Sequence, residues 1–238
     1  WGAAVLPYRE ADMTGWPITE ADLAPHYRAV TEFLPVAGRR DDLAALFPAL
    51  PMAGRRPLPH PVQVEALLAR LADARDRLQA LGLTAGAARQ AVDAGCRRCG
   101  LCLHGCPYRL IWSARDEIAR LRRNPSFGYR PGAIVTRIEE TGSGVTLHLA
   151  GGQTIGAPRV FLGAGVLETA RILLASAPGA DTLTLRDSQH AFLPMLHRWR
   201  NAERPDRGRF HTLPQVFLEL DAPEVSPFLV HAQVYSWN

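Results

Sequence analysis

The sequence predicts an α+β protein, with helices mainly in its first half and antiparallel strands in its second half. Three patterns indicate this fold class. Leucines recur at helical spacing in residues 62–82, short alternating segments separated by glycine-rich turns fill residues 133–165, and two strand-like apolar runs cover residues 213–221 and 227–237. Of the 238 residues, 47% are hydrophobic, so the chain can bury the core of one or two globular domains.

The helices are predicted from their end signals as well as from their periodicity. Thr19 and Asp22 have the spacing of a capping box, which predicts a helix that begins after Thr19. Residues 37–62 are rich in Pro, Gly and Arg, which predicts an irregular connector with room for one helical turn. The leucine-rich segment predicts one amphipathic helix ended by Gly82, and "LIWSARDEIARLRRNP" predicts a further helix stopped by Pro125.

The strands are predicted from alternation. The segments "AIVTRIEE", "GVTLHLAGG" and "QTIGAPRVFLGAG" predict a small antiparallel meander that leads into a buried strand. The next segment, "LETARILLASA", predicts a short helix. A polar, arginine-rich stretch follows residue 180, and the sequence contains no internal repeat.

Composition limits the function classes. The formal net charge is +4, and the sequence contains no lysine, which excludes a P-loop lysine and a Schiff-base lysine within these residues. The arginine pairs are scattered among acidic residues, which is typical of a solvated surface rather than of a nucleic-acid patch. The longest apolar run, "VFLGAGVL", is far shorter than the ~20 residues of a membrane span. The chain begins at Trp1 and stops within an apolar run, so we expect it to be a piece of a longer protein.

All four cysteines lie in one short run, Cys96, Cys99, Cys102 and Cys106, with the spacing C-x2-C-x2-C-x3-C-P. Cysteines packed so closely could not staple distant parts of the chain, so we expect no disulfide framework and a reducing compartment, the cytoplasm. The spacing is that of a bacterial ferredoxin half-site. It makes an iron–sulfur cluster the first interpretation.

Other interpretations of the cysteine run stay open. In two-cluster ferredoxins the fourth cysteine ligates the other cluster, and no second cysteine run exists here. A three-iron cluster, a ligand from outside these residues, a structural zinc clip, or no metal at all would each account for that.

A second signal is the strand–turn–helix pattern of "RVFLGAGVLETARILL". Gly163 and Gly165 lie where half of a dinucleotide-binding fingerprint would place them, but Glu168 stands where the third glycine belongs. The histidines form no constellation: His231 is interpreted as a satisfied polar residue on a strand, and His190, His197 and His211 are expected in polar loops. Ser113 lacks the Gly-x-Ser-x-Gly elbow of a hydrolase.

Taken in order, these pieces resemble the glucose–methanol–choline family of FAD-dependent oxidoreductases. The resemblance covers most of the chain and is strongest in the "GA.V.RI" meander and the strand–turn–helix that follows it. Within that family, the sequence also resembles a little-characterised bacterial group, with which it shares several short motifs. The segments that carry the resemblance are "WPITEADLAPHYRAVTEFLPVAG", "CGLCLHGCPYRLIWSARDEIARL", "FGYRPGAIVTRIEE", "RVFLGAGVLETARILLAS", Leu185–Gln189 and His211–Glu219.

The resemblance implies specific residues and domains. The backbone of Val135 would contact the adenine of FAD, and the turn of Gly163, Ala164 and Gly165 would lie near the cofactor. Residues 1–130 would form a mainly helical segment with the cysteine-rich loop at 96–107. Residues 131–178 would belong to the FAD-binding domain, and residues 179–238 to the antiparallel sheet of the substrate-binding domain.

The function implied is hydride transfer from the CH–OH group of an alcohol or sugar-type substrate to FAD. The N-terminal glycine fingerprint and the C-terminal histidine pair of the family are absent, so we expect these residues alone to be inactive, with the catalytic base elsewhere. A protein electron acceptor is a further expected partner. The alternative is an iron–sulfur electron-transfer module that uses the Cys96–Cys106 run and binds no flavin.

Overall fold

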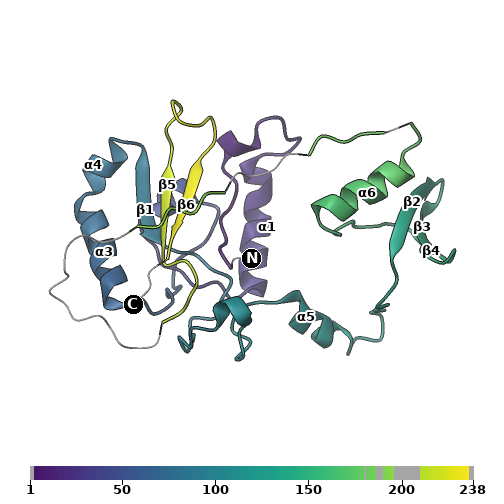
Figure 1. The fold of residues 1–238 in the computed structure, drawn as a ribbon, viewed down its shortest axis with the longest axis horizontal. Helices are drawn as coiled ribbons and strands as arrows, with labels where there is room; N and C mark the ends of the chain where they lie inside the picture. Colours follow the sequence, from purple (N-terminus) through teal and green to yellow (C-terminus); the bar gives the residue numbers. More distant parts are fainter. Residues whose placement is uncertain (1–2, 180, 186–189, 196–209, 236–238) are drawn as a thin grey trace. The chain divides into compact units, whose positions relative to one another are not determined.

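The computed structural model describes residues 3–179, 181–185, 190–195 and 210–235, and it divides into two compact units. Unit 1 comprises Trp1–Ala119 together with Arg200–Asn238, and unit 2 comprises Arg120–Trp199. Unit 1 is continuous in space because strands from both of its segments pair in one sheet (Figure 1). The three segments expected for a larger flavoprotein stay a prediction.

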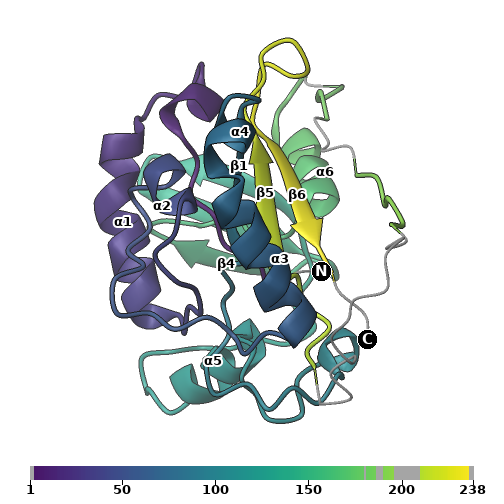
Figure 2. The same ribbon diagram turned by 90° about the vertical axis from the view of Figure 1, so that its left-hand side faces the viewer.

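The sheet of unit 1 is antiparallel in the order β1 (Leu83–Ala87), β5 (Val216–Leu220) and β6 (Val230–Val234). One face is covered by α3 (Val62–Asp73), which runs across the sheet in Figure 2, and by α4 (Arg75–Gln79) next to β1. The core on this face consists of side chains from α3, β1 and β5: Val64, Leu68, Ala87 and Val216.

The opposite face of this sheet packs against α2 (Leu43–Leu46). Phe217 is wholly buried there among Leu43, Phe47 and Ala88. Gly86 makes this approach possible, because a Cβ at this position would lie 2.6 Å from the Asp41 carboxylate. The absence of a side chain therefore lets the α2 segment lie directly on β1.

A buried ion pair ties the same segment to the end of β1. The guanidinium of Arg89 donates to Asp41 Oδ1 at 2.8 Å, and the Ala87 backbone N–H donates to Asp41 Oδ2 at 2.8 Å. Arg89 is wholly buried, so its charge depends on this carboxylate for compensation.

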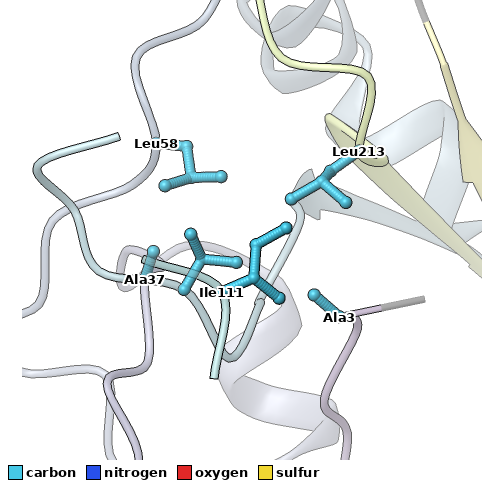
Figure 3. Close-up of a cluster of buried hydrophobic side chains, with 6 residues drawn as sticks. Ala3, Ala37, Leu58, Ile111 and Leu213 are labelled. Atoms are coloured by element: carbon cyan, nitrogen blue, oxygen red, sulfur yellow. The ribbon is translucent and has the colours of Figure 1, made fainter. Parts of the chain in front are cut away.

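The remaining elements of unit 1 are short except for α1 (Glu20–Phe33), which begins with the predicted capping box of Thr19 and Asp22. Two 3-10 turns, η1 (Glu10–Met13) and η2 (Cys102–His104), precede α5 (Ala114–Leu121). A separate core cluster lies beside the cysteine run. Figure 3 shows side chains of this cluster gathered together, among them Ala3, Ala37, Leu58, Ile111 and Leu213. Val92 is its sixth member.

Unit 2 is an antiparallel meander of β2 (Val135–Thr141), β3 (Gly144–Leu149) and β4 (Thr154–Ala157), with α6 (Val166–Ser176) packed on β2. The Ile138 backbone N–H donates to Ser176 Oγ at 2.9 Å, and the Ile172 side chain of α6 is buried. These contacts fix the end of α6 against the middle of β2.

Three predicted elements need correction. The leucine-rich segment is two helices rather than one, because the chain turns at Ala74 (φ −91°, ψ 8°) between α3 and α4. The helix before Pro125 begins only at Ala114, because Ile111 pairs with Val92 in a β-bridge. The buried strand after the meander is absent from the described residues: β4 ends before Pro158, and Phe161 is 89% exposed, since no further strand is available there to pair with it.

The other expectations for secondary structure are confirmed, namely α1, the turn of helix in the 37–62 connector, the meander, α6, β5 and β6. The mixed helix and antiparallel sheet agree with the α+β class. In the described part of the chain, no helix has the length and apolar character needed to cross a bilayer. His197 and residues 186–189 of the Leu185–Gln189 motif lie outside the described residues.

Candidate functional site

The cysteine run forms a loop that is closed at its base. Val92 and Ile111 form an antiparallel β-bridge, and the Asp93 backbone N–H donates to the Leu110 carbonyl at 2.8 Å. The loop between them, residues 93–110, is therefore held at both ends by the core cluster of unit 1.

The backbone of this loop turns repeatedly through the left-handed region. Gly100 (φ 74°) and Gly105 (φ 93°) adopt it without a steric penalty. Arg98 (φ 50°) and Arg109 (φ 54°) adopt it as well, which costs each roughly 1–2 kcal/mol. The cysteines of the loop line its interior, whereas Leu101 and Leu103, between Gly100 and Gly105, are exposed.

All four cysteines line one small cavity inside the loop. They are half-buried free thiols, and the cavity has a volume of about 10 Å³, room for about one water molecule. The guanidinium of Arg97 lies 4.8 Å from the centre of the Tyr108 ring at the edge of this cavity. The rest of the wall comes from Val92, Leu110, Ile111 and Leu213.

The surroundings of the Cys96 thiol favour its protonated form. Burial raises the pKa of the Cys96 thiol above its ordinary value; a hydrogen bond from the Arg98 backbone opposes this shift, and the neighbouring cysteines add to it. The Leu110 backbone N–H donates to Cys106 Sγ at 3.4 Å. The run therefore behaves as an apolar packing cluster with two backbone donors directed at sulfur.

The donor chemistry of the loop fits an iron–sulfur cluster or zinc, since thiolates are the soft ligands that both prefer. The arrangement does not fit. Among residues that the structure describes, no three Cys, His, Asp or Glu side chains are placed together to hold a metal ion, and the cavity is one water in size.

A buried histidine lies next to this loop. A Cβ at Gly100 would lie 3.8 Å from the Phe210 carbonyl oxygen. The residue after Phe210, His211, is wholly buried, whereas the sequence predicted it in a polar loop. Neither ring nitrogen of His211 has a hydrogen-bond partner of good geometry among the described residues. Its ring centre is 6.4 Å from that of His60, whose Nδ1 lies 2.8 Å from Glu65 Oε1.

The predicted FAD-contacting residues lie in unit 2. Val135 opens β2, and its carbonyl accepts a hydrogen bond from Arg171 of α6 at 3.0 Å. Gly163, Ala164 and Gly165 form the exposed turn before α6, where a Cβ at either glycine would meet nothing within 4 Å. Backbone atoms of this turn are therefore open to close approach by a ligand.

Arg171 connects the two predicted segments. Besides bonding Val135, its Nε donates to Glu168 Oε2 at 2.8 Å, and Glu168 lies in the first turn of α6. A carboxylate at a helix N-terminus opposes the binding of a second anion there. This turn therefore suits a neutral part of a cofactor better than a pyrophosphate.

Sequence reasoning missed two groups. Glu219 was not singled out, but it is wholly buried on β5 and accepts a hydrogen bond from His231 on β6. The burial of His211 was also missed. Register and tertiary packing decide both, and neither leaves a local signal in the sequence.

Comparison with known proteins gives no family. Neither a family model nor a curated protein matches the chain.

Proposed function

We propose that the chain is the central part of an FAD-dependent oxidoreductase that acts on the CH–OH group of an alcohol or sugar-type substrate. The observation that carries this proposal is the link from Arg171 to Val135, because it joins the meander to the turn and helix whose sequence resembles the glucose–methanol–choline family. FAD would supply a hydride acceptor. This function remains a proposal from the resemblance and the local geometry together.

The chain's own residues would have limited tasks in such an enzyme. Val135 would present its backbone to the adenine, with its carbonyl already held by Arg171. The open turn at Gly163–Gly165 would admit a neutral part of the cofactor without steric conflict. Because Glu168 disfavours an anion at α6, the pyrophosphate would be bound by residues other than this turn.

A tryptophan beside the predicted adenine contact tests this assignment. Ala133 is exposed two residues before Val135, so Ala133→Trp places a large ring there without entering a core. We expect FAD affinity of the full-length protein to fall by about tenfold or more. Ser143→Trp, in the exposed turn at the other end of β2, is the matched control and should leave the affinity unchanged. Equal affinities of the two variants would exclude the assignment of Val135.

The convergence of four thiols on one cavity favours a second candidate, an iron–sulfur electron-transfer module without flavin. Its support is the convergence of the thiols alone, since the described residues contain no set of side chains arranged to hold a metal ion. Free cysteines also support a reducing compartment such as the cytoplasm. Iron, sulfide and zinc analysis of the full-length protein separates this candidate from a structural zinc clip and from metal-free thiols.

A further inference from the structure

The four thiols of the cysteine loop share a cavity that the proposed flavin chemistry does not use. They are free and half-buried, and all four line a space of about 10 Å³, which admits about one water molecule. Sulfur atoms on the wall of so small a space lie close to one another. Small backbone movements can therefore bring two of them into the geometry of a disulfide.

Two observations select Cys96 and Cys102 as the pair. Both pack against the core cluster beside the loop. Of the three other cysteines, Cys102 acts most strongly on the Cys96 sulfur electrostatically, ahead of Cys106 and Cys99. Because Coulomb interactions weaken with distance, this order indicates that Cys102 is the nearest of the three. Cys106 is already engaged, since its Sγ accepts a hydrogen bond from the Leu110 backbone N–H at 3.4 Å.

The backbone between the two cysteines has room to adjust. A disulfide would close a ring of residues 96–102, which contains Gly100 in the left-handed region (φ 74°). The base of the loop is held independently by the β-bridge between Val92 and Ile111. Oxidation would therefore change the loop while the core cluster of unit 1 stays in place.

Cys102 is the thiol that a small oxidant reaches first. It begins the 3-10 turn η2, and the residues on either side of it, Leu101 and Leu103, are 46% and 71% exposed. Cys96 lies near the base of the loop, where its backbone N–H donates to the Asp93 carbonyl at 3.2 Å. A cavity one water in size admits hydrogen peroxide but excludes a bulky disulfide such as oxidised glutathione.

We infer that Cys96 and Cys102 form a reversible oxidation site for hydrogen peroxide. The Cys102 sulfur attacks one peroxide oxygen: the S–O bond forms, the O–O bond breaks, and the leaving hydroxide takes up the thiol proton as water. The Cys96 sulfur then attacks the Cys102 sulfenic acid, so that the S–S bond forms, the S–O bond breaks and a second water leaves. In sum, two thiols lose two electrons and two protons, and one peroxide becomes two water molecules. A small external thiol reverses the reaction by exchange.

Trypsin separates the two proposed partners, which makes their disulfide directly measurable. It cuts after each arginine of the Arg97–Arg98 pair, so Cys96 and the other cysteines end in different peptides, residues 90–97 and 99–109. The reduced full-length protein is treated with hydrogen peroxide, its remaining thiols are blocked with N-ethylmaleimide in denaturant, and the peptides are analysed by mass spectrometry.

We expect the two peptides to be linked, with a mass two hydrogens below their sum and with Cys99 and Cys106 blocked by maleimide. Treatment with dithiothreitol before blocking should remove the link. Oxidised glutathione in place of peroxide should form the link at least about tenfold more slowly. A disulfide confined to residues 99–109, or no disulfide after peroxide treatment, would overturn the inference.

Variants identify the partner and the order of the steps. Cys102→Ser should abolish the link, whereas Cys99→Ser, at another cysteine of the same cavity, is the matched control and should keep it. Cys102→Ala keeps the position apolar and serves the same purpose if the serine variant does not fold. In Cys96→Ser, oxidation should stop at the sulfenic acid, so labelling of Cys102 by dimedone should rise about tenfold or more over the wild type. Unchanged labelling there, or a link that survives the loss of Cys102, would overturn the inference.

The oxidation site does not depend on flavin. A purified protein without FAD would refute the proposed function and leave the result of the peptide analysis as it is. Iron or zinc bound by the four thiols, with no disulfide formed after peroxide treatment, would instead overturn the oxidation site and favour a metal-binding loop.

Discussion

The buried His211 makes stability depend on acidic pH. Burial lowers its pKa from 6.5 to about 4, the positive charges of His60 and Arg98 act in the same direction, and a weak interaction with the Leu213 backbone opposes them. The unfolded chain therefore takes up a proton near pH 6.5, whereas the folded protein does so only near pH 4. The contribution of His211 to the free energy of unfolding is therefore fully present above pH 7 and is lost as the pH falls from about 6.5 to about 4.

The size of the effect follows from the two pKa values. Between pH 7.5 and pH 5, His211 reduces the free energy of unfolding by about 2 kcal/mol. His211→Phe replaces the imidazole with an apolar ring and removes two buried nitrogens that lack partners of good geometry. Between pH 7.5 and pH 5, we expect the free energy of unfolding of this variant to fall by about 2 kcal/mol less than that of the wild type.

Urea denaturation followed by circular dichroism at pH 7.5 and pH 5 measures this difference. Titrating groups that do not interact with His211 contribute equally to both proteins, so they cancel in the comparison; His60, whose charge acts on His211, is the neighbour whose titration changes with the substitution. His26→Phe, at an exposed position of α1, is the matched control and should keep the wild-type pH dependence. The same loss of stability in His211→Phe and wild type would refute the burial of an unprotonated His211.

Two further predictions concern stability. Gly82→Ala should lower the free energy of unfolding of unit 1 by roughly 2 kcal/mol or more in urea denaturation, because φ at Gly82 is +72° and a Cβ there would collide with the backbone of the loop after β5. Gly54→Ala is the control: φ at Gly54 is +73° but its surroundings are open, so the variant should show only the cost of the backbone conformation, about 1 kcal/mol. Equal effects would contradict the collision. Arg89→Met should lower the free energy of unfolding by roughly 3–5 kcal/mol, because Asp41 loses its buried partner. Arg75→Met removes an exposed ion pair and should have little effect. An unchanged free energy of unfolding in Arg89→Met would contradict the importance of the buried pair.

Local signals in the sequence account for much of the fold. The capping box of Thr19 predicted the start of α1, and alternation with glycine turns predicted the β2–β3–β4 meander. β1 was not predicted, because "LTAGA" contains mostly small residues and its strand conformation comes from pairing with β5, far away in the sequence. The break at Ala74 was also missed, since alanine favours a continuous helix and only tertiary packing opposes it.

The candidate sites, like the fold, were predictable from the sequence only in part. Cysteine spacing predicted that four thiols would converge, and the structure places all four on one cavity, but spacing alone could not reveal that this cavity is only one water in size. The pairing of Glu219 with His231 depends on the register of β5 and β6, which the sequence does not specify. Whether Val135 and the Gly163–Gly165 turn contact FAD stays a prediction.

The measurement that tests the central proposal most directly is an absorption spectrum, with flavin, iron and sulfide analysis, of the full-length protein purified without oxygen. We predict resolved flavin bands and one FAD for each chain. Iron and sulfide in stoichiometric amounts without any flavin would contradict the proposed oxidoreductase and establish the cysteine loop as an electron-transfer site.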